Sequence, residues 1–596
     1  MKKKEVFLLP CKAIYLTHYT HTFEFLPTSA KECQRRGWNY VDVILFTGDA
    51  YVDHPSFGAA VIGRTLEAQG YRVAVIPQPN WRDDLRDFKK LGAPRLFFGV
   101  TSGSMDSMVN RYTANRRLRS SDAYTPDGRN DMRPDYAAYV YARTLKELFP
   151  QVPVVLGGVE ASLRRFTHYD YWQDTLRPSI LYDTRADMLV YGMGEKPIAE
   201  VARRLSCGEA VEALTDIPQT AYMRRKGCGS SAAVALHSFE DCQKSKAKFA
   251  ENFTRIETES NKVQAAVLQE AVGDMVVVVN PQYPPMSEQE IDASFDLPYT
   301  RLPHPRYRDK RIPAYEMVKH SINIHRGCFG GCSFCAISMH QGKFVASRSQ
   351  QSVLEEAKKV AALPDFRGYL SDVGGPSANM YRMQGRSAKA CAKCSRCSCL
   401  YPRRCGNLNA DTAPLLELYA KIRALPGVKK AFVGSGIRYD LVVDEHGFLD
   451  EAAQKYFQTL LRHHVSGRLK VAPEHTAEEV LAAMRKPSYR LFYQLKQLFD
   501  AQNRAENLRL QLIPYFISSH PACTNAHMQQ LADITRLQGF RLEQVQDFTP
   551  TPMTLSSVMY YTGLNPYTKE KIYVARSKEQ KLKQNSCFFW YKNEKS

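Results

Sequence analysis

Eight of the fifteen cysteines fall into two short clusters, and the first cluster has the spacing C-x3-C-x2-C. Its members are Cys328, Cys332 and Cys335. Clustered cysteines in a large chain indicate metal binding rather than disulfides. Three thiolates on one short loop can each bind one iron of a [4Fe–4S] cluster, and an open fourth iron is typical of a catalytic centre. A structural zinc site completed by His325 or His340 is the alternative.

The second cluster places five cysteines within 15 residues. The five are Cys391, Cys394, Cys397, Cys399 and Cys405. They could hold an auxiliary Fe–S cluster or a structural zinc, because both metals accept thiolates. Free, redox-active thiols are the third alternative. Four ligands complete a tetrahedral zinc site, so one of the five should be dispensable, and we expect this redundancy in the closely spaced pair Cys397 and Cys399.

Segment 1–205 alternates short apolar runs with amphipathic stretches, which predicts an α/β domain with an open parallel sheet. Two predicted strands end in glycine turns followed by an acid, at Glu160 and Glu195. Ligands of such sheets bind at the carboxyl ends of the strands. No GxGxxG motif follows a strand, so a dinucleotide site is not supported. The predicted strands are Val41–Phe46, Tyr71–Ile76, Arg95–Val100, Val152–Leu156 and Met188–Tyr191.

Segment 206–310 breaks this rhythm with a polar helical stretch and several prolines, and we interpret it as a connecting region. The alternation resumes over 311–560, which predicts a partial barrel of six parallel strands with an insertion at 391–405. The remaining residues, 561–596, read as a basic C-terminal tail. The six predicted strands are Ser321–His325, Gly368–Val373, Lys430–Val433, Leu469–Ala472, Arg509–Ile513 and Leu542–Phe548.

The first cysteine cluster, with Phe334 just before its third cysteine, resembles the signature of the radical S-adenosylmethionine (radical SAM) superfamily. The resemblance implies a partial (β/α)6 barrel in which the three cysteines hold a [4Fe–4S] cluster and SAM chelates the fourth iron. It also implies reductive cleavage of SAM to methionine and a 5′-deoxyadenosyl radical, with an electron donor such as a flavodoxin or ferredoxin. Over most of its length, including residues 45–58 and the second cluster, the chain is similar to the YgiQ-type radical SAM proteins.

The resemblance also assigns residues at the ends of later strands. Gly374 and Gly375 resemble the superfamily's Gly-Gly-Glu turn near the SAM amino group, although Pro376 stands where glutamate is commoner. Ser435 and Arg438 lie in a segment similar to the one that contacts the ribose and carboxylate of SAM. Three further polar residues at strand ends are candidate SAM contacts or acid–base groups, and each alone could equally be structural. They are Glu474, His475 and His520.

In related architectures the N-terminal α/β domain resembles a cobalamin-binding domain. This chain departs from the Asp-x-His-x-x-Gly motif that supplies a cobalt ligand, because Asp53 and His54 are adjacent and the next glycine is Gly58. A histidine ligand to cobalt is therefore not supported. Base-off cobalamin binding without a protein ligand stays open.

The chain has 596 residues, a formal net charge of +20 and 44% hydrophobic residues, which indicates an ordinary globular protein. No apolar run approaches the length of a membrane span, and the opening residues do not read as a signal peptide, so we expect a cytoplasmic protein without membrane partners. The positive charge favours attraction to phosphate and keeps RNA among the candidate substrates. A zinc- or Fe–S-bearing nucleic-acid-binding protein without catalysis is the alternative function.

Overall fold

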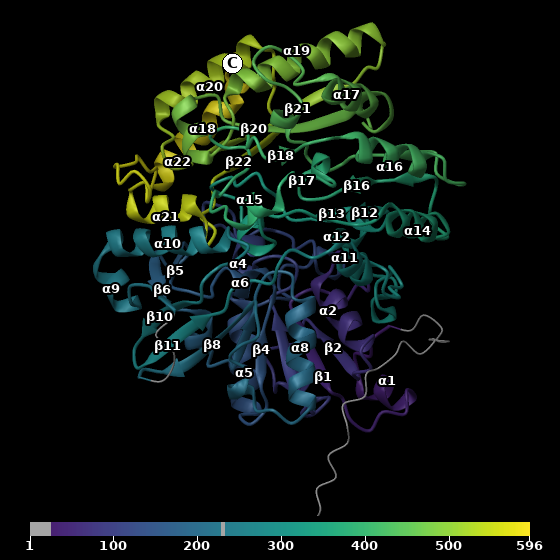
Figure 1. Cartoon of the computed structure of the whole chain (residues 1–596), viewed down its shortest axis with the longest axis vertical. Coiled ribbons are helices and arrows are strands. Elements are labelled where there is room, and N and C mark those ends of the chain that lie inside the picture. Colours follow the sequence, from purple (N-terminus) through teal and green to yellow (C-terminus); the bar gives the residue numbers. More distant parts are fainter. Residues whose placement is uncertain (1–24, 228–232, 596) are drawn as a thin grey trace, which may run out of the picture.

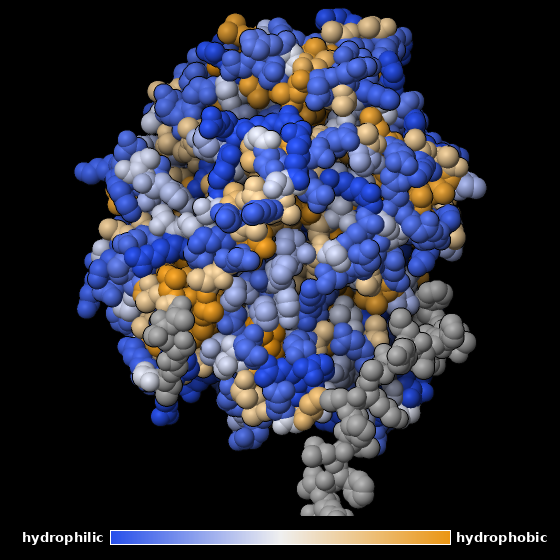
Figure 2. Space-filling view, in the orientation of Figure 1, coloured by the Kyte–Doolittle hydropathy of each residue, from blue (hydrophilic) through white to orange (hydrophobic). Residues whose placement is uncertain are grey.

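Figure 1 shows the computed structural model, which describes residues 25–227 and 233–595. The N-terminal sheet and its helices form one half of the molecule, and the C-terminal strands and helices form the other. The opening residues, on which the prediction of no signal peptide rests, lie outside the described residues. Within the described ranges, no helix is long and apolar enough to cross a membrane. The face in Figure 2 is largely hydrophilic, with apolar residues in small patches.

The described N-terminal strands form a nine-stranded sheet in the order β2-β1-β3-β4-β7-β8-β11-β10-β9. The first five strands in this order are parallel. All five coincide with predicted strands to within two residues, which confirms the α/β class. They are β1 (Val43–Thr47), β2 (Val73–Pro77), β3 (Phe97–Thr101), β4 (Val154–Leu156) and β7 (Met188–Val190).

Helices cover both faces of this sheet because successive strand residues point to opposite sides. On one face, Ile44 packs in an apolar cluster with residues of α5 (Ala137–Leu148). On the other, Val43 packs in a second cluster with residues of α2 (Gly58–Glu67) and α8 (Glu195–Ser206). The central strands are thus buried on both sides, as their continuous apolar sequences require.

The other four strands come from the segment predicted as a connecting region. They are β8 (Thr220–Arg225), β9 (Val234–Ala235), β10 (Leu268–Val272) and β11 (Met275–Val279). β8 runs antiparallel to β7, and β11 runs antiparallel to both β8 and β10. The expected parallel sheet is therefore parallel-rich but mixed. Both segments, 1–205 and 206–310, contribute strands to it, and the proposed division into domains stays a prediction.

Each strand predicted within 311–560 forms over at least part of its length. The six main strands are β12 (Ser321–Asn323), β16 (Asp372–Gly374), β19 (Lys430–Ala431), β20 (Arg468–Glu474), β21 (Gln511–Ser518) and β22 (Gln544–Asp547). β12 pairs with β16, β19 pairs with β15 (Tyr369–Leu370), and β20, β21 and β22 form a third group, all in parallel. The described strands do not join into one continuous sheet, so the partial barrel stays a prediction.

The C-terminal segment packs against both halves through α22 (Lys578–Ser586). The Gln584 side chain is buried and accepts a hydrogen bond from the Ser519 backbone at 2.9 Å. Lys581 donates to the Tyr171 hydroxyl at 2.6 Å. The residues predicted as a basic tail thus include a helix that contacts the end of β21 and the N-terminal half.

A buried ion pair joins α10 (Lys246–Ser260) to the C-terminal core: Arg485 donates to both carboxylate oxygens of Glu257, at 2.7 and 2.9 Å. Glu257→Ala leaves the guanidinium buried without its carboxylate, and we expect the free energy of unfolding to fall by about 3 kcal/mol. Urea denaturation measures the loss. The matched control is Glu316→Ala, which removes a more exposed pair with Lys319 and should cost less than about 1 kcal/mol. Equal losses would contradict the role of the buried pair.

Candidate active site

The three cysteines of the first cluster lie on the loop that follows β12 and β13 (His325–Arg326). The Cys328 sulfur lies 3.6 Å from the Ser377 hydroxyl, and Arg438 donates to the Cys332 sulfur at 3.3 Å. Burial raises the pKa of the Cys335 thiol to about 12, and the charges of Cys332 and Cys328 act in the same direction. The three thiols are therefore neighbours on one loop, with one guanidinium beside them.

Two glycines let this loop turn tightly. A Cβ on Gly330 would lie 2.7 Å from Arg438 Nη1 and 3.3 Å from the Cys328 sulfur. Gly331 has φ +62°, and a Cβ there would lie 2.4 Å from the Cys397 carbonyl oxygen. Three soft donors, a tight glycine loop and a compensating cation fit a cluster that binds one thiolate per iron. Among the described residues, no group of three or more Cys, His, Asp or Glu side chains is arranged to hold a single metal ion.

Strand β16 contacts the turn that follows β19. The Asp372 carboxylate accepts hydrogen bonds from the Gly434 backbone at 2.8 Å, from the Ser435 backbone at 3.2 Å, and from the Ser435 hydroxyl. A Cβ on Gly374 would lie 3.0 Å from the Ser435 hydroxyl oxygen. Two predicted cofactor-binding residues, Gly374 and Ser435, are thus in contact, and Asp372 holds them together.

Gly375 lies directly against the ring of His325. A Cβ on Gly375 would lie 2.5 Å from His325 Cε1 and 2.8 Å from both ring nitrogens, so only glycine fits. His325 is buried, and burial lowers its pKa to about 4, which keeps the ring neutral. The zinc alternative drew attention to His325, but its contact with Gly375 was not foreseen.

Arg438, the fourth predicted cofactor-binding residue, is fixed from several sides. Its backbone exchanges two hydrogen bonds with the Asn379 side chain, at 2.8 and 2.9 Å. Its guanidinium forms a two-pronged pair with Asp440, at 2.8 and 2.5 Å, in addition to the contact with Cys332. Sequence reasoning missed Asn379 and Asp440, although an acid two residues after a buried arginine is a recognisable signal.

Glu474 ends β20 with φ +71°, and its buried carboxylate lies 3.6 Å from the Lys486 ammonium. Burial raises the pKa of Glu474, and Lys486 opposes this shift. The charge of Glu474 also acts on the Cys335 thiol. Of the three predicted acid–base residues, Glu474 is therefore the one whose charge reaches the cysteine loop.

His475 and His520 are fully buried, and burial lowers the pKa of each to about 3. His475 accepts a hydrogen bond from the Ala477 backbone at 3.0 Å. His520 lies 2.7 Å from the Ser556 hydroxyl, which is 2.8 Å from the hydroxyl of Ser333 in the cysteine loop. These hydrogen bonds hold both neutral rings in place. The catalytic roles of His475 and His520 stay predictions.

In the second cluster, Cys399 and Cys397 differ in the charges that act on them. Burial raises the pKa of the Cys399 thiol to about 11, and the charges of Cys405, Cys394 and Cys391 act in the same direction. Cys397 is different, because the charges that act on it come from Arg485, Glu257 and Lys343 rather than from the other four thiols. Cys397 therefore differs from Cys399 in the charged groups that act on it.

A buried lysine lies beside this cluster. Lys343 is 2% exposed, and its ammonium contacts the Arg396 carbonyl oxygen at 2.7 Å and the Cys394 sulfur at 3.8 Å. No carboxylate within the described residues pairs with it. A negative partner stabilises a buried ammonium, and the Cys394 thiolate could provide one, while the charge of Lys343 also acts on the Cys399 thiol. Nothing in the sequence around Lys343 pointed to this contact.

The cysteine-rich insertion is hydrogen-bonded to the first cysteine loop. The buried Ser398 hydroxyl donates to the Gly330 carbonyl at 2.7 Å, and the Cys399 backbone donates to the Phe329 carbonyl at 3.0 Å. Ser398 also accepts hydrogen bonds from two backbone amides of its own segment, Leu400 and Tyr401, at 3.0 Å each. Hydrogen bonds thus connect the two segments that carry the cysteine clusters.

A cavity of about 600 Å³ lies between the carboxyl ends of the N-terminal strands and the segments around the cysteine loop. Its lining includes the β4 end at Gly157, the β7 end at Met193, and His325 and Gly375 from the C-terminal half. The predicted turn residue Glu195 also lines it and forms an ion pair with Arg326, two residues before the first cysteine. Both halves of the molecule therefore enclose this space.

The other residues singled out in the N-terminal half do not line this cavity. Glu160 is buried and accepts hydrogen bonds from the Ser107 and Ala138 backbones, at 2.7 and 3.1 Å. Asp53 pairs with Arg64 at 2.6 Å. His54 is not among the residues that line the cavity. His54, the histidine nearest to the cobalt-binding motif in sequence, is therefore not placed to bind a cobalamin in this cavity.

The chain is similar to known proteins over most of its length. The family model described as "Radical SAM N-terminal" matches residues 25–321, and a "Domain of unknown function (DUF3362)" matches residues 543–595. The chain is 59% identical to a UPF0313 protein of Bacteroides thetaiotaomicron, covering 96% of this chain and 94% of that one. It is 43% identical to the UPF0313 protein YgiQ of Escherichia coli, covering 94% and 82%.

Among solved structures, the radical S-adenosylmethionine methyltransferase TsrM from Kitasatospora setae matches with a TM-score of 0.48 at 17% identity, covering 86% of this chain and 75% of that one. The sequence similarities show that the chain is a member of the radical SAM superfamily. Within that superfamily it belongs to the UPF0313 family, which includes YgiQ. The resemblance stated from the sequence is thereby confirmed.

Ser398 tests the link between the two cysteine clusters. Ser398→Ala removes the hydroxyl that contacts Gly330, and we expect protection of the 328–335 amides from hydrogen exchange to decrease, with a stability loss of about 1–3 kcal/mol. Hydrogen-exchange mass spectrometry measures the first effect and urea denaturation the second. The control is Ser395→Ala, in the same segment but exposed. Unchanged exchange in Ser398→Ala would show that the loop does not depend on this contact.

Proposed function

We propose that this protein is a radical SAM enzyme whose [4Fe–4S] cluster is held by Cys328, Cys332 and Cys335. The observation that supports it most is the convergence of the three thiols, Arg438 and the Gly374–Gly375 turn at one end of the C-terminal strands. When bound, the cluster supplies the electron that cleaves SAM to methionine and a 5′-deoxyadenosyl radical. The chain's own residues then have to bind SAM, orient it and exclude water.

The surrounding residues divide these tasks. The Arg438 guanidinium offsets the negative charge of the thiolates, and Asp440 keeps it in place. Gly375 leaves room for the buried His325 ring, which packs against the turn whose backbone would contact SAM. Ser435, whose hydroxyl is held by Asp372, offers a polar contact to the ribose or carboxylate of SAM.

The cavity of about 600 Å³ is the proposed chamber for the substrate, because it lies next to the cysteine loop and is lined from both halves. The electron would come from a flavodoxin or ferredoxin, and the net charge of +20 keeps RNA among the candidate substrates. Cobalamin, if it binds in this chamber, would do so base-off and without a cobalt ligand from His54. A visible spectrum after incubation with aquacobalamin and gel filtration tests this point.

We also propose that the second cysteine cluster binds a metal through Cys391, Cys394, Cys399 and Cys405. Two observations support the proposal: the charges of the other three thiols act on Cys399, and the buried Lys343 ammonium lies beside Cys394. The spare thiol is then Cys397, the member of the Cys397/Cys399 pair that faces Arg485 and Glu257. Four thiolates are enough for either an Fe–S cluster or zinc, but the described side chains are not arranged around a single ion, so the loop would have to adjust on binding.

Replacing any one of Cys328, Cys332 or Cys335 with Ala should abolish SAM cleavage, because three ligands are needed to keep a cluster with one open iron. The measurement is 5′-deoxyadenosine formed anaerobically under dithionite. The control is Cys207→Ala, which changes an exposed cysteine and should keep wild-type yield. A wild-type yield from Cys332→Ala would refute radical chemistry. If the protein binds nucleic acid and has no catalytic activity, neither the wild type nor any variant would form 5′-deoxyadenosine.

Gly375→Val should weaken SAM binding more than it weakens cluster assembly, because the new side chain collides with His325 at the turn. The SAM-induced change of the cluster EPR signal is titrated at fixed iron content. The control is Gly436→Ala, since a Cβ at Gly436 meets nothing within 4 Å. Loss of iron in parallel with loss of SAM binding would mean that the turn supports the fold instead.

Metal analysis tests the second cluster in protein made anaerobically with Cys328, Cys332 and Cys335 all changed to Ala. Retention of about four irons with sulfide indicates an auxiliary cluster, and one zinc indicates a structural site. Cys399→Ser should lose the metal, whereas Cys397→Ser should keep it. Free alkylation of all five thiols in the folded protein, with neither metal present, would contradict the proposal.

A further inference from the structure

Arg165 differs from the other buried arginines of the described residues, because no carboxylate pairs with it. The other pairs are Arg64 with Asp53, Arg133 with Asp49, Arg164 with Asp106, Arg301 and Arg348 with Glu356, Arg438 with Asp440, and Arg485 with Glu257. Arg165 itself is 2% exposed. Burying an uncompensated charge costs several kcal/mol, so this position calls for a physical explanation.

The contacts of Arg165 use only part of the hydrogen-bonding capacity of its guanidinium. Nη1 donates to the Ser162 carbonyl at 2.5 Å, and Nη2 reaches the Ser260 hydroxyl only at 3.5 Å. Nε is buried and has no hydrogen-bond partner. The guanidinium lies 4.7 Å from the centre of the Tyr191 ring, which orients it without neutralising it. A guanidinium with a free edge is suited to two-pronged recognition of a carboxylate or phosphate.

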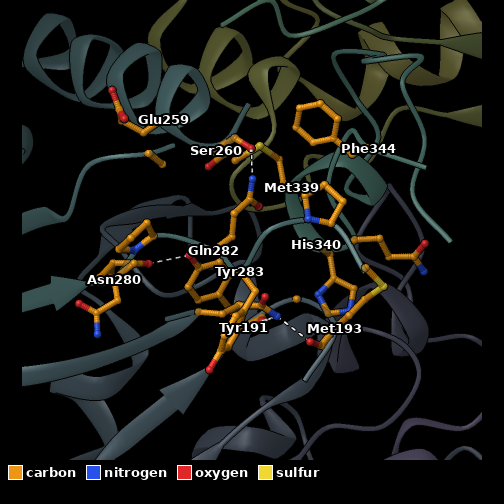
Figure 3. A pocket seen from close by; sticks show the side chains of 18 of the residues that line it. Tyr191, Met193, Glu259, Ser260, Asn280, Gln282, Tyr283, Met339, His340 and Phe344 are labelled. Atoms are coloured by element: carbon orange, nitrogen blue, oxygen red, sulfur yellow. Dashed lines mark hydrogen bonds between the residues drawn. The ribbon is translucent and has the colours of Figure 1, made fainter. Parts of the chain in front are cut away.

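Arg165 is one of the residues that line a pocket of about 70 Å³. Figure 3 shows this pocket from close by. Figure 3 shows Tyr191, Met193 and His340 on one side of this pocket and Ser260 and Gln282 on another. Gln282 donates to the Ser260 carbonyl at 3.3 Å, which fixes that wall. The pocket joins the sheet end at β7, the end of α10, and the segment that follows the first cysteine loop.

The charges around the pocket leave a net positive site. Its acidic lining residue, Glu259, is already bound by the Lys262 ammonium at 2.6 Å and the Ala266 backbone at 2.8 Å. Lys196, a second cation of the lining, is paired with Glu290. His340 is neutral, because burial and the charge of Arg165 lower its pKa to about 4. An anion entering here would therefore meet one unpaired guanidinium and no competing carboxylate.

We propose that Arg165 binds an anionic group, a phosphate or a carboxylate, of the molecule that occupies the neighbouring chamber. The pocket and the 600 Å³ cavity share Gly192, Met193, His340 and Gln341, so a ligand anchored at Arg165 extends toward the cysteine loop. Anion binding itself is independent of the reaction. The further assignment, that the substrate of the radical chemistry carries an acidic group, rests on the proposed function.

The test is isothermal titration calorimetry of the purified full chain with inorganic phosphate and, separately, with acetate, at constant ionic strength. Tighter binding of one ion over the other distinguishes a phosphate group from a carboxylate. Arg165→Met should weaken the preferred ion by at least about tenfold, because the two-pronged contact is lost. Lys196→Met is the matched control, since it removes a paired cation of the same pocket and should leave the dissociation constant nearly unchanged. Equal affinity in wild type and Arg165→Met, or no binding of either ion to wild type, would overturn the proposal.

Thermal unfolding supplies a second readout. Without anion, Arg165→Met should unfold at the wild-type temperature or above it, because an uncompensated buried charge is removed. Arg164→Met should unfold at a lower temperature, because it leaves Asp106 buried without its partner. A large fall in Arg165→Met would mean that the guanidinium is structural. Phosphate binding is then repeated on the cluster-free protein with Cys328, Cys332 and Cys335 changed to Ala. Retained binding there, together with no 5′-deoxyadenosine from wild type, would refute the proposed function and leave the anion site standing.

Discussion

The arrangement of the candidate site depends on one buried guanidinium, that of Arg438. It contacts the Cys332 thiol on one side and the Asp440 carboxylate on the other, while Asn379 holds its backbone. Because burying an unpaired charge costs free energy, few other orientations of the Arg438 side chain are favourable. The loop after the first strand and the turns after the second and third strands are therefore held in one geometry by a single residue.

Lys343 and Arg165 are buried and have no carboxylate partner among the described residues, and both lie next to the proposed sites. Lys343 faces the thiols of the second cluster, and Arg165 faces the small pocket beside the chamber. In each case the missing negative charge has a natural source outside the chain's carboxylates: metal-bound thiolates for Lys343 and a ligand's acidic group for Arg165. These two cations are the observations on which the proposed metal and anion sites rest.

Local patterns in the sequence predicted the parts of this structure that depend on local residues. Strand β1 was found because its apolar run is continuous, and the cysteine loop because its spacing is short and regular. Strand β8 was missed because it ends in Met-Arg-Arg, which reads as a solvated segment although it pairs with both β7 and β11. Spacing also could not tell whether Cys397 or Cys399 faces the other thiols, since that depends on how the loop turns. The lack of a carboxylate partner for Arg165 can be recognised only when every residue packed around it is known. A pattern in the sequence does not supply that knowledge.

The hydrogen bonds between Ser333 and Ser556 have a consequence for the order in which the protein is made. Ser333 sits between the second and third cysteines of the first loop, and its backbone carbonyl and hydroxyl are both bound by Ser556 of α21 (Leu555–Thr562). During synthesis the loop emerges from the ribosome more than two hundred residues before that partner. The nascent loop therefore stays without one of its walls until Ser556 has been made, and the three thiols stay more accessible during this interval.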